Sequence, residues 1–262
     1  MIIKIEREDL EAFSFIFGVV FGSFLNVLIY RLPKQISILK PSFCPSCGKK
    51  IKYFENIPLI SYIFLKAKCG SCKNKISFRY FLVELITGFL TLFLFLQVSL
   101  SFEFFYLIIL FYTLIVLSFI DIKYKAVPDY LLLIALIVAF FATKDEFLVS
   151  LENACIFAGF FVLLEFIITF YIQNIKAKLI KDDTLRKAKA LGEGDIPIIA
   201  IIGAVLGIKA GVIAIFLAGI FAIIPSILNT LLKKDSQIPF IPFLVMGFLF
   251  EFFINISSKV FT

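Results

Sequence analysis

The stretch Leu191-Gly192-Glu193-Gly194-Asp195 sets a carboxylate directly after a Gly-x-Gly turn and directly before the apolar run 196–206. Glycine lets the backbone turn sharply and approach a neighbouring segment closely. We therefore predict that Asp195 lies at the mouth of a membrane-embedded helix, supported by Gly192 and Gly194. An ionisable side chain at such a boundary is costly, so a functional site is the default interpretation.

A second carboxylate, Asp121, ends another apolar run, Ser118-Phe119-Ile120-Asp121. Short glycine motifs arise by chance, but two acids at the ends of two apolar runs can meet at one depth. Asp129 follows Pro128 at the expected start of the next helix, so its simplest role is to cap that helix. Asp121 and Asp195 are therefore the candidate catalytic residues.

The composition indicates an all-α, polytopic membrane protein. Of the 262 residues, 61% are hydrophobic and 35 are Phe, and the mean hydropathy is +1.03. This apolar fraction exceeds that of typical soluble domains, whereas a helix that crosses the bilayer needs about 20 apolar residues. The hydropathy pattern predicts about eight spans, at residues 12–30, 80–100, 103–120, 128–142, 153–172, 195–207, 210–231 and 239–257. The first run is too long for the apolar region of a cleavable signal peptide and is interpreted as a transmembrane helix.

Lys and Arg are distributed unevenly over the segments between these spans. Of the 26, 21 fall in segments that this topology puts on one side, namely 31–79, 121–128, 173–194 and 232–235. The positive-inside rule places that side in the cytosol. Asp121 and Asp195 then both lie at cytosolic helix ends. The basic loops are interpreted as facing membrane lipid, and no nucleic-acid partner is expected.

The sequence contains no histidine. This excludes a His-based zinc protease helix, a Ser-His or Cys-His nucleophile pair and a histidine proton relay. If the chain catalyses hydrolysis with its own side chains, carboxylates are the leading acid–base candidates near neutral pH.

The expected cytosolic segment contains two Cys-x-x-Cys pairs with 21 residues between them. The four cysteines are Cys44, Cys47, Cys69 and Cys72. This spacing fits a zinc-ribbon-like loop with four thiolate ligands, slightly beyond the usual gap, and Gly48 and Gly70 suit its tight turns. Such a site is closed, so the zinc would be structural; redox thiols or unliganded cysteines are the alternative. Cys155 stands alone in a span and is interpreted as a small apolar filler.

Four further polar residues lie in or near the predicted spans. Asn26 is a buried amide that needs a partner, and Glu84 either pairs with Arg79 or faces a cavity. Glu165 and Glu251 lie inside spans, where each could be a buried protonated acid, a partner for Asn26 or part of a polar path. A polar path would favour a transporter or channel instead of an enzyme.

Taken together, these motifs resemble the bacterial type IV prepilin peptidase and N-methyltransferase family, membrane aspartic proteases with a Gly-x-Gly-Asp motif. The resemblance covers nearly the whole chain in order. It rests on the segments 22–27, 44–47 with 69–72, 55–61, 79–85, 120–129, 191–195 and 238–243. Pro197 follows Asp195 where the family commonly has Lys one position away, and Glu165 and Glu251 are not features of the family pattern.

The resemblance implies two activities in the inner (cytoplasmic) membrane. The first is cleavage of prepilins and pseudopilins after a glycine on the cytosolic face, with Asp121 and Asp195 matching the catalytic pair. The second is methylation of the new N-terminal amine with S-adenosylmethionine, an activity that accompanies the four-cysteine set. The implied organisation is a first helix in residues 1–31, a cysteine loop and methyltransferase region in 32–79 and a peptidase domain in 80–262. A noncatalytic zinc-ribbon assembly factor is the remaining alternative.

Two carboxylates a few ångströms apart suit water activation, because repulsion and desolvation separate their titrations. Asp195 is expected at a helix N-terminus, where the dipole favours a negative charge, and Asp121 at a helix C-terminus, where it does not. The sequence therefore predicts Asp195 as the resting base and Asp121 as the acid.

Overall fold

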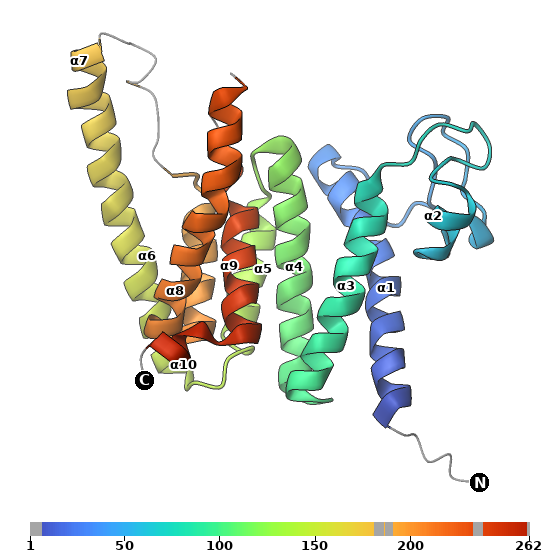
Figure 1. Cartoon of the computed structure of the whole chain (residues 1–262), viewed down its shortest axis with the longest axis horizontal. Coiled ribbons are helices and arrows are strands. Elements are labelled where there is room, and N and C mark those ends of the chain that lie inside the picture. Colours follow the sequence, from blue (N-terminus) through green and yellow to red (C-terminus); the bar gives the residue numbers. More distant parts are fainter. Residues whose placement is uncertain (1–6, 181–185, 187–190, 233–237, 261–262) are drawn as a thin grey trace. The chain divides into compact units, whose positions relative to one another are not determined.

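The protein is described by a computed structural model that covers residues 7–180, 186, 191–232 and 238–260, and within these ranges it is helical with no β-strand (Figure 1). The long helices are α1 (Arg7–Arg31), α3 (Phe78–Val98), α4 (Phe102–Tyr124), α5 (Asp129–Ala139), α6 (Phe147–Phe170), α8 (Asp195–Leu231) and α9 (Ile241–Ile254). The short ones are α2 (Ile60–Phe64), α7 (Ala177–Ile180) and α10 (Ile256–Val260), and a π-helical segment, Tyr171–Lys176, joins α6 to α7.

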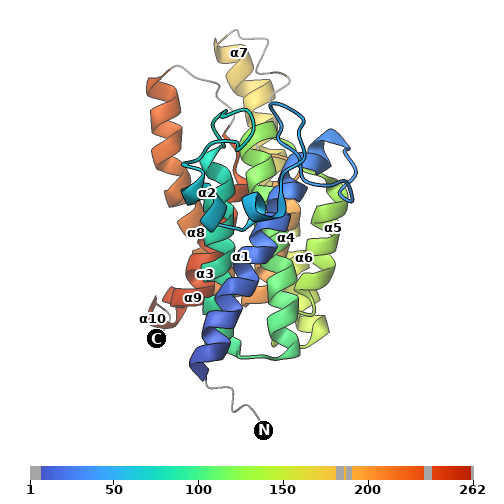
Figure 2. The same ribbon diagram turned by 90° about the vertical axis from the view of Figure 1, so that its right-hand side faces the viewer.

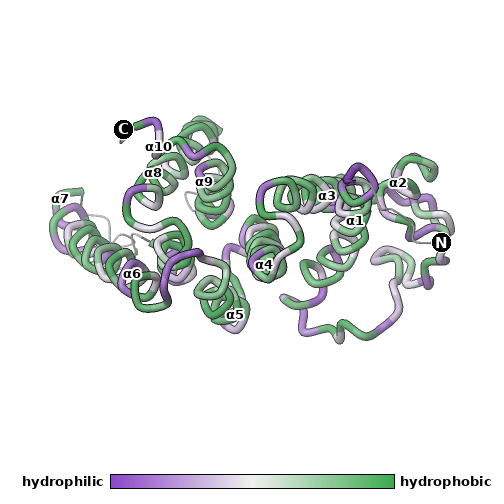
Figure 3. The backbone as a smooth tube through the Cα atoms, turned by 90° about the horizontal axis from the view of Figure 1, so that it is seen from below, coloured by the Kyte–Doolittle hydropathy of each residue, from purple (hydrophilic) through white to green (hydrophobic). Residues whose placement is uncertain are grey.

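Five of these helices are long and apolar enough to cross a membrane, and α5 and α9 are shorter apolar helices. The five are α1, α3, α4, α6 with its extension to Ile180, and α8. Hydrophobic colour runs along all of them in Figure 3. The prediction of an all-α, polytopic membrane protein is confirmed.

The predicted spans 195–207 and 210–231 fall in one helical element, α8, which is broken at Gly207 (φ 72°, ψ −176°). The ring of Phe157 lies against two glycines of α8. It would be 2.6 Å from a Cβ placed on Gly203 and 2.7 Å from a Cβ placed on Gly211. Eight residues of straight helix would separate the two glycines by about 12 Å, too far for one ring to touch both. The chain therefore doubles back at Gly207, and counting the two halves of α8 separately gives the eight segments that hydropathy predicts.

The chain divides into two compact units, Met1–Val116 and Leu117–Thr262, with α4 contributing to both. In the first unit, α1 packs on α3 through small residues (Figure 2). Gly18 and Gly22 of α1 lie against Thr87 and Thr91 of α3, and Gly88 of α3 lies against Val19. Small residues let membrane helices approach closely.

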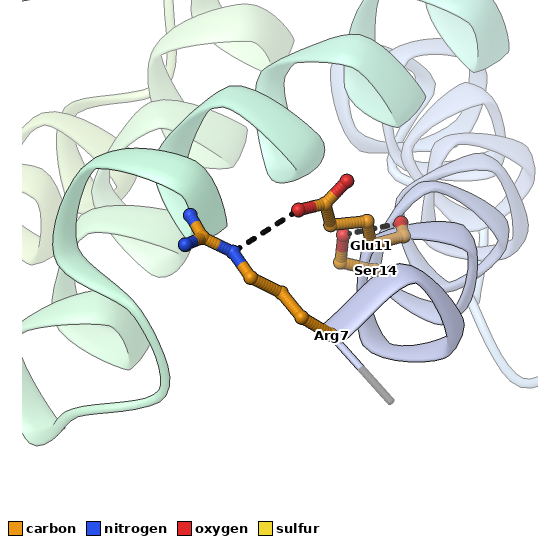
Figure 4. A network of polar contacts seen from close by, with 3 residues as sticks. All are labelled: Arg7, Glu11 and Ser14. Carbon is orange, nitrogen blue, oxygen red and sulfur yellow. Dashed lines mark hydrogen bonds and ion pairs between the residues drawn. The ribbon is translucent and has the colours of Figure 1, made fainter. Parts of the chain in front are cut away.

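Helix α1 includes Arg7, whereas hydropathy marks its apolar part only from residue 12. The difference arises because the first turns of the helix are polar. Figure 4 shows Arg7 Nε donating to Glu11 Oε1 at 3.2 Å and Ser14 Oγ donating to the Glu11 carbonyl at 2.8 Å. An exposed pair at this spacing contributes only about 0.2–0.5 kcal/mol, so it extends the helix without anchoring it.

In the second unit, α8 packs against α5, α6 and α9. Ser150 Oγ of α6 donates to the Ala204 carbonyl of α8 at 2.8 Å. Gly247 of α9 lies against the backbone of Ala214 and Ala218, a contact that a side chain would prevent. The first turn of α8 and the first turn of α9 both lie in this unit.

The close packing of α1 on α3 predicts a difference between two glycines. A Cβ on Gly22 would lie 2.7 Å from the Glu84 Cα, a backbone atom that cannot move aside, whereas a Cβ on Gly159 of α6 has nothing within 4 Å. Gly22→Ala is therefore expected to destabilise the protein by about 1–3 kcal/mol. Gly159→Ala is the matched control and should leave the thermal midpoint in detergent unchanged or raise it. Equal midpoints for the two variants would contradict this packing.

Candidate active site

Asp195 is the first residue of α8 and closes the turn that precedes it. Its N–H donates to the Gly192 carbonyl at 3.0 Å, and its Oδ2 accepts a hydrogen bond from the Gly192 N–H at 2.9 Å. This reciprocal pair follows the geometry of a capping box, in which a side chain reaches back three residues to an unpaired N–H. The spacing of the first glycine and the aspartate is therefore a requirement of the turn.

Gly194 lets this turn approach its neighbours. A Cβ there would lie 2.7 Å from Val127 Cγ2 and 3.3 Å from Ile241 Cδ1. The turn therefore packs between the segment before α5 and the first residue of α9. Glycine is needed at this position for close approach, since its φ lies outside the left-handed region.

Asp121 lies in the last turn of α4 and is 7% exposed, and Asp195 is 6% exposed. The Ile241 N–H, at the start of α9, donates to Asp121 Oδ2 at 3.3 Å. Both aspartates lie beside Ile241: its N–H binds Asp121, and its side chain lies against Gly194, the residue before Asp195. The structure thus brings together the two aspartates that the sequence singles out, both within the unit Leu117–Thr262. Asp129, by contrast, is exposed at the start of α5.

The hydrogen bond from Ile241 changes the electrostatic argument made from the sequence. That argument set Asp121 at an unfavourable helix C-terminus, but the first N–H of α9 also points at its carboxylate. An N-terminal amide favours a negative charge, as it does at Asp195. Each aspartate therefore has one backbone donor, and helix ends alone no longer separate acid from base.

Glu251 has a structural role that the sequence did not reveal. It is 2% exposed, and its two carboxylate oxygens accept hydrogen bonds from the N–H groups of Ile256 and Ser257, at 3.2 and 2.9 Å. These are the first two residues of α10. Glu251 therefore caps the start of α10.

In the first unit, the four cysteines that the sequence pairs lie together. Their Sγ atoms are all within 4.8 Å of one another, and those of Cys44 and Cys72 are 3.9 Å apart. A tetrahedral zinc with Zn–S distances of about 2.3 Å places its sulfurs about 3.8 Å apart. The donor set and its dimensions therefore fit a four-thiolate zinc site.

The two cysteine turns have the same backbone design. In the first, the Cys44 N–H donates to the Lys49 carbonyl at 2.9 Å; in the second, the Cys69 N–H donates to the Asn74 carbonyl at 2.9 Å. The left-handed residue is Gly48 in the first turn (φ 71°) and Lys73 in the second (φ 59°). Gly70 lies in the second turn, but it does not take the left-handed conformation there; it lies close against the Glu55 carboxylate.

The second turn also favours a thiolate at one position. The N–H groups of Cys72 and Ser71 lower the pKa of the Cys69 thiol to about 7. Thiolates are the metal-binding form of cysteine, so this lowering favours metal binding by the second turn near neutral pH.

Buried polar residues tie the cysteine loop to α1 and α3. Asn26 Nδ2 donates to the Tyr80 carbonyl at 2.9 Å, while Asn26 Oδ1 has no partner within the described residues. Glu84 Oε2 accepts from the Leu59 N–H at 2.8 Å, so Glu84 does not pair with Arg79 as one alternative had it. Leu59 has a φ of 59°, a conformation that costs about 1–3 kcal/mol in a non-glycine residue. The Glu84 carboxylate offsets that strain.

Sequence reasoning missed a third anchor, Arg31 at the end of α1. It is 3% exposed, and its guanidinium donates four hydrogen bonds to backbone carbonyls at 2.7–3.1 Å. The acceptors belong to Ser37, Ile38, Lys40 and Pro41. Arg31 thereby orders the segment that leads into the first cysteine turn. Its position as the last residue of a helix carries no such signal in the sequence.

Two family models match the chain, the bacterial Peptidase A24 N-terminal domain over residues 16–98 and the type IV leader peptidase family over residues 108–227. A protein of Vibrio cholerae, named Prepilin leader peptidase/N-methyltransferase, is 32% identical over 250 residues, which are 91% of this chain and 94% of that protein. The chain belongs to the type IV leader peptidase family. Proteins of the same name from Neisseria gonorrhoeae and Bacillus subtilis are 31% and 30% identical over 83% and 89% of the chain, and 82% and 90% of their own lengths. No solved structure matches.

The two family models divide the site residues of this type IV leader peptidase family member in two. The cysteine cluster, Asn26 and Glu84 fall within the N-terminal model, and Asp121 and Asp195 within the leader peptidase model. The Ile241 amide that binds Asp121 lies beyond the second model, in the first turn of α9.

The cysteine geometry predicts a metal requirement. Purified protein is expected to contain one zinc per chain, and Cys44→Ser with Cys69→Ser should remove it, because each cysteine turn then loses one of its two ligands. Cys155→Ser changes an exposed cysteine of α6 and should keep the zinc. Elemental analysis of the purified proteins measures the metal content. Retention of stoichiometric zinc by the double variant would contradict the assignment.

Proposed function

We propose that this protein removes the leader peptides of type IV prepilins and pseudopilins after a glycine and then methylates the new N-terminal amine. Membership of the type IV leader peptidase family and the names of its relatives support the reaction class. The observation that carries the proposal is the position of Asp121 and Asp195, two buried carboxylates that each accept a backbone hydrogen bond and that both lie beside Ile241. Two such acids form the minimal apparatus for activating water at a peptide bond.

In the proposed reaction, one carboxylate of the pair is ionised and the other is protonated. The ionised one takes a proton from water as the oxygen attacks the carbonyl carbon, and the protonated one donates a hydrogen bond to the carbonyl oxygen. Collapse of the tetrahedral intermediate breaks the C–N bond, and the nitrogen leaves with a proton from the pair. Because the two acids interact, their titration belongs to the pair and not to either residue.

The backbone donors give the pair its fixed geometry. The Gly192 N–H binds Asp195 and the Ile241 N–H binds Asp121, so neither side chain relies on a mobile partner. Preorganised donors stabilise developing charge without a reorganisation cost during the reaction. Gly192 and Gly194 support catalysis in this scheme by allowing the turn, not by touching substrate.

We place the reaction at the cytosolic face of the inner membrane. The support is the distribution of Lys and Arg, which favours that side for the segments bordering Asp121 and Asp195. A substrate with an apolar N-terminal helix can then lie in the bilayer while its leader stays in the cytosol. Membrane lipid and the prepilin or pseudopilin are the proposed partners.

We assign methyl transfer to the unit that holds the cysteine loop, residues 32–79. S-adenosylmethionine would supply a methyl group from its sulfonium for transfer to the amine. The cysteine cluster would hold zinc in a structural role, since all four positions around the metal are filled by protein. Asn26, whose buried Oδ1 has no partner among the described residues, and Glu84 help to link this loop to the helices and are its proposed supporting residues.

Asp121→Asn and Asp195→Asn are each expected to lower cleavage by at least about 100-fold, because each removes an acid–base group and keeps the shape. The measurement is co-expression with a prepilin that carries a Gly-Phe junction, followed by mass analysis of the product. Asp129→Asn, which changes an exposed acid on the next helix, should cleave as wild type does. Retained cleavage in either active-site variant would contradict the two-aspartate mechanism, and ion flux without cleavage would favour a transporter.

Prepilin cleavage and N-terminal methylation are expected to be lost independently of one another. The variant with Cys44→Ser and Cys69→Ser should still cleave the prepilin, because the aspartates lie in the other unit, but its product should lack the added methyl group. The same mass spectrum measures both outcomes, and Cys155→Ser is the control. Loss of cleavage with normal protein yield, or full methylation, would overturn this assignment.

A further inference from the structure

The short helix α2, in the cysteine loop, has an outward face that is apolar. Its residues Ile60, Ile63 and Phe64 are 52%, 64% and 83% exposed. Residues three and four apart lie on the same side of a helix, so these three side chains form one continuous face. A helix on a water-exposed loop has the opposite arrangement, with its apolar side on the protein and its polar side outward.

Two contacts tie α2 to the first two turns of α3. The ring of Tyr62 in α2 lies 5.4 Å from the ring of Phe81, centroid to centroid. The N–H of Leu59, the residue before α2, donates to Glu84 Oε2 at 2.8 Å. Phe81 and Glu84 are the fourth and seventh residues of α3, and Figure 1 shows α2 level with the upper turns of that helix. The short helix therefore lies beside the start of α3.

The start of α3 lies inside the bilayer because the helix has no length to spare. It has 21 residues, which at about 1.5 Å per residue extend over about 30 Å, the thickness of the hydrocarbon core. Its first two turns must then lie in the leaflet on the side of the cysteine loop. The contacts of Tyr62 and Leu59 place α2 at the same depth.

Exposed basic residues flank α2. Lys66 and Lys68 follow it in the chain, and Lys52 precedes the helical turn Tyr53–Asn56, which contacts α2. A lysine can keep its stem in apolar surroundings while its ammonium group reaches the headgroups, where anionic lipid attracts it. An apolar face flanked by lysines is typical of a helix that lies in the plane of the membrane interface.

We propose that α2 is an in-plane membrane anchor, with Ile60, Ile63 and Phe64 embedded in the lipid of the leaflet on the cysteine-loop side. The observations favour lipid over a protein partner because the face continues the apolar surface of a membrane-spanning helix. Phe78, the first residue of α3, is 59% exposed, and its ring lies 6.5 Å from that of Tyr62. The anchor holds the cysteine loop against the bilayer, and it does not depend on the reaction that the protein catalyses.

The chain contains no tryptophan, so a single introduced Trp reports only on its own position. Ile63→Trp and Phe64→Trp are measured separately in the full-length protein in phospholipid nanodiscs. Two reference variants accompany them: Phe89→Trp, at a 44% exposed position in the middle of α3, and Lys49→Trp, at an exposed position of the first cysteine turn. Trp emission is recorded with acyl chains brominated near the headgroup, with acyl chains brominated near the tail, and with acrylamide in the water. An unchanged thermal midpoint shows that each variant has folded.

Chains brominated near the headgroup are expected to lower the emission at positions 63 and 64 by at least about twofold, because an in-plane face is buried about 5–10 Å into the boundary between headgroups and acyl chains. Chains brominated near the tail should quench these two positions less. The order should be reversed at position 89. At position 49, acrylamide should quench strongly and brominated lipid weakly.

Three results would overturn the anchor. Quenching of both α2 reporters by acrylamide and not by brominated lipid would place the face in water. Shielding from both quenchers would show that protein covers the face, as in contact with a second copy of the chain. Loss of the lipid quenching when a prepilin is added at saturation would assign the face to the substrate instead of to lipid.

Discussion

Two carboxylates at the ends of apolar helices can be kept only if polar groups of the protein satisfy them, and here the backbone does so. The Gly192 N–H binds Asp195, and the Ile241 N–H binds Asp121. Neither donor is a side chain, so the constraint acts on the backbone: the turn before α8 must fold back onto Asp195, and the first turn of α9 must reach the last turn of α4. Burying a charged group without such partners would cost several kcal/mol. This close approach also explains why position 194 is a glycine, because there is no room for a side chain between Val127 and Ile241.

The loop that contains the four cysteines also depends on hydrogen bonds between buried polar side chains and the backbone. Its loop has little apolar core and is held by buried polar anchors, namely Arg31 on four carbonyls and Glu84 on the strained amide of Leu59. Two matching turns then bring their thiols to the spacing that a tetrahedral metal needs. The loop is therefore anchored to α1 and α3 by hydrogen bonds and closed on itself by its cysteines.

The helical architecture, the cysteine cluster and the position of the two aspartates at the ends of apolar helices could be predicted, because each depends on a local pattern. Hydropathy marks apolar runs, Cys-x-x-Cys marks a metal turn, and an acid that ends an apolar run is conspicuous. What could not be predicted depends on contacts between distant residues. The Ile241 amide at Asp121, the cap that Glu251 provides and the anchor at Arg31 all join a side chain to backbone atoms. Backbone donors and acceptors carry no residue identity, so the sequence contains no signal for these contacts. The second cysteine turn shows the same limit: Lys73, and not the nearby glycine, takes the left-handed conformation.

The central claim is that Asp121 and Asp195 face one another in a single site. The most direct measurement is cross-linking of the double variant Asp121→Cys with Asp195→Cys in membranes, with a short bifunctional thiol reagent, Cys155 replaced by Ser and the zinc retained to protect the other cysteines. Mass analysis of the digested protein should find the two peptides joined to each other, and pre-treatment with a monofunctional thiol reagent should prevent it. Two introduced thiols that each react with the monofunctional reagent and never become linked would contradict the account.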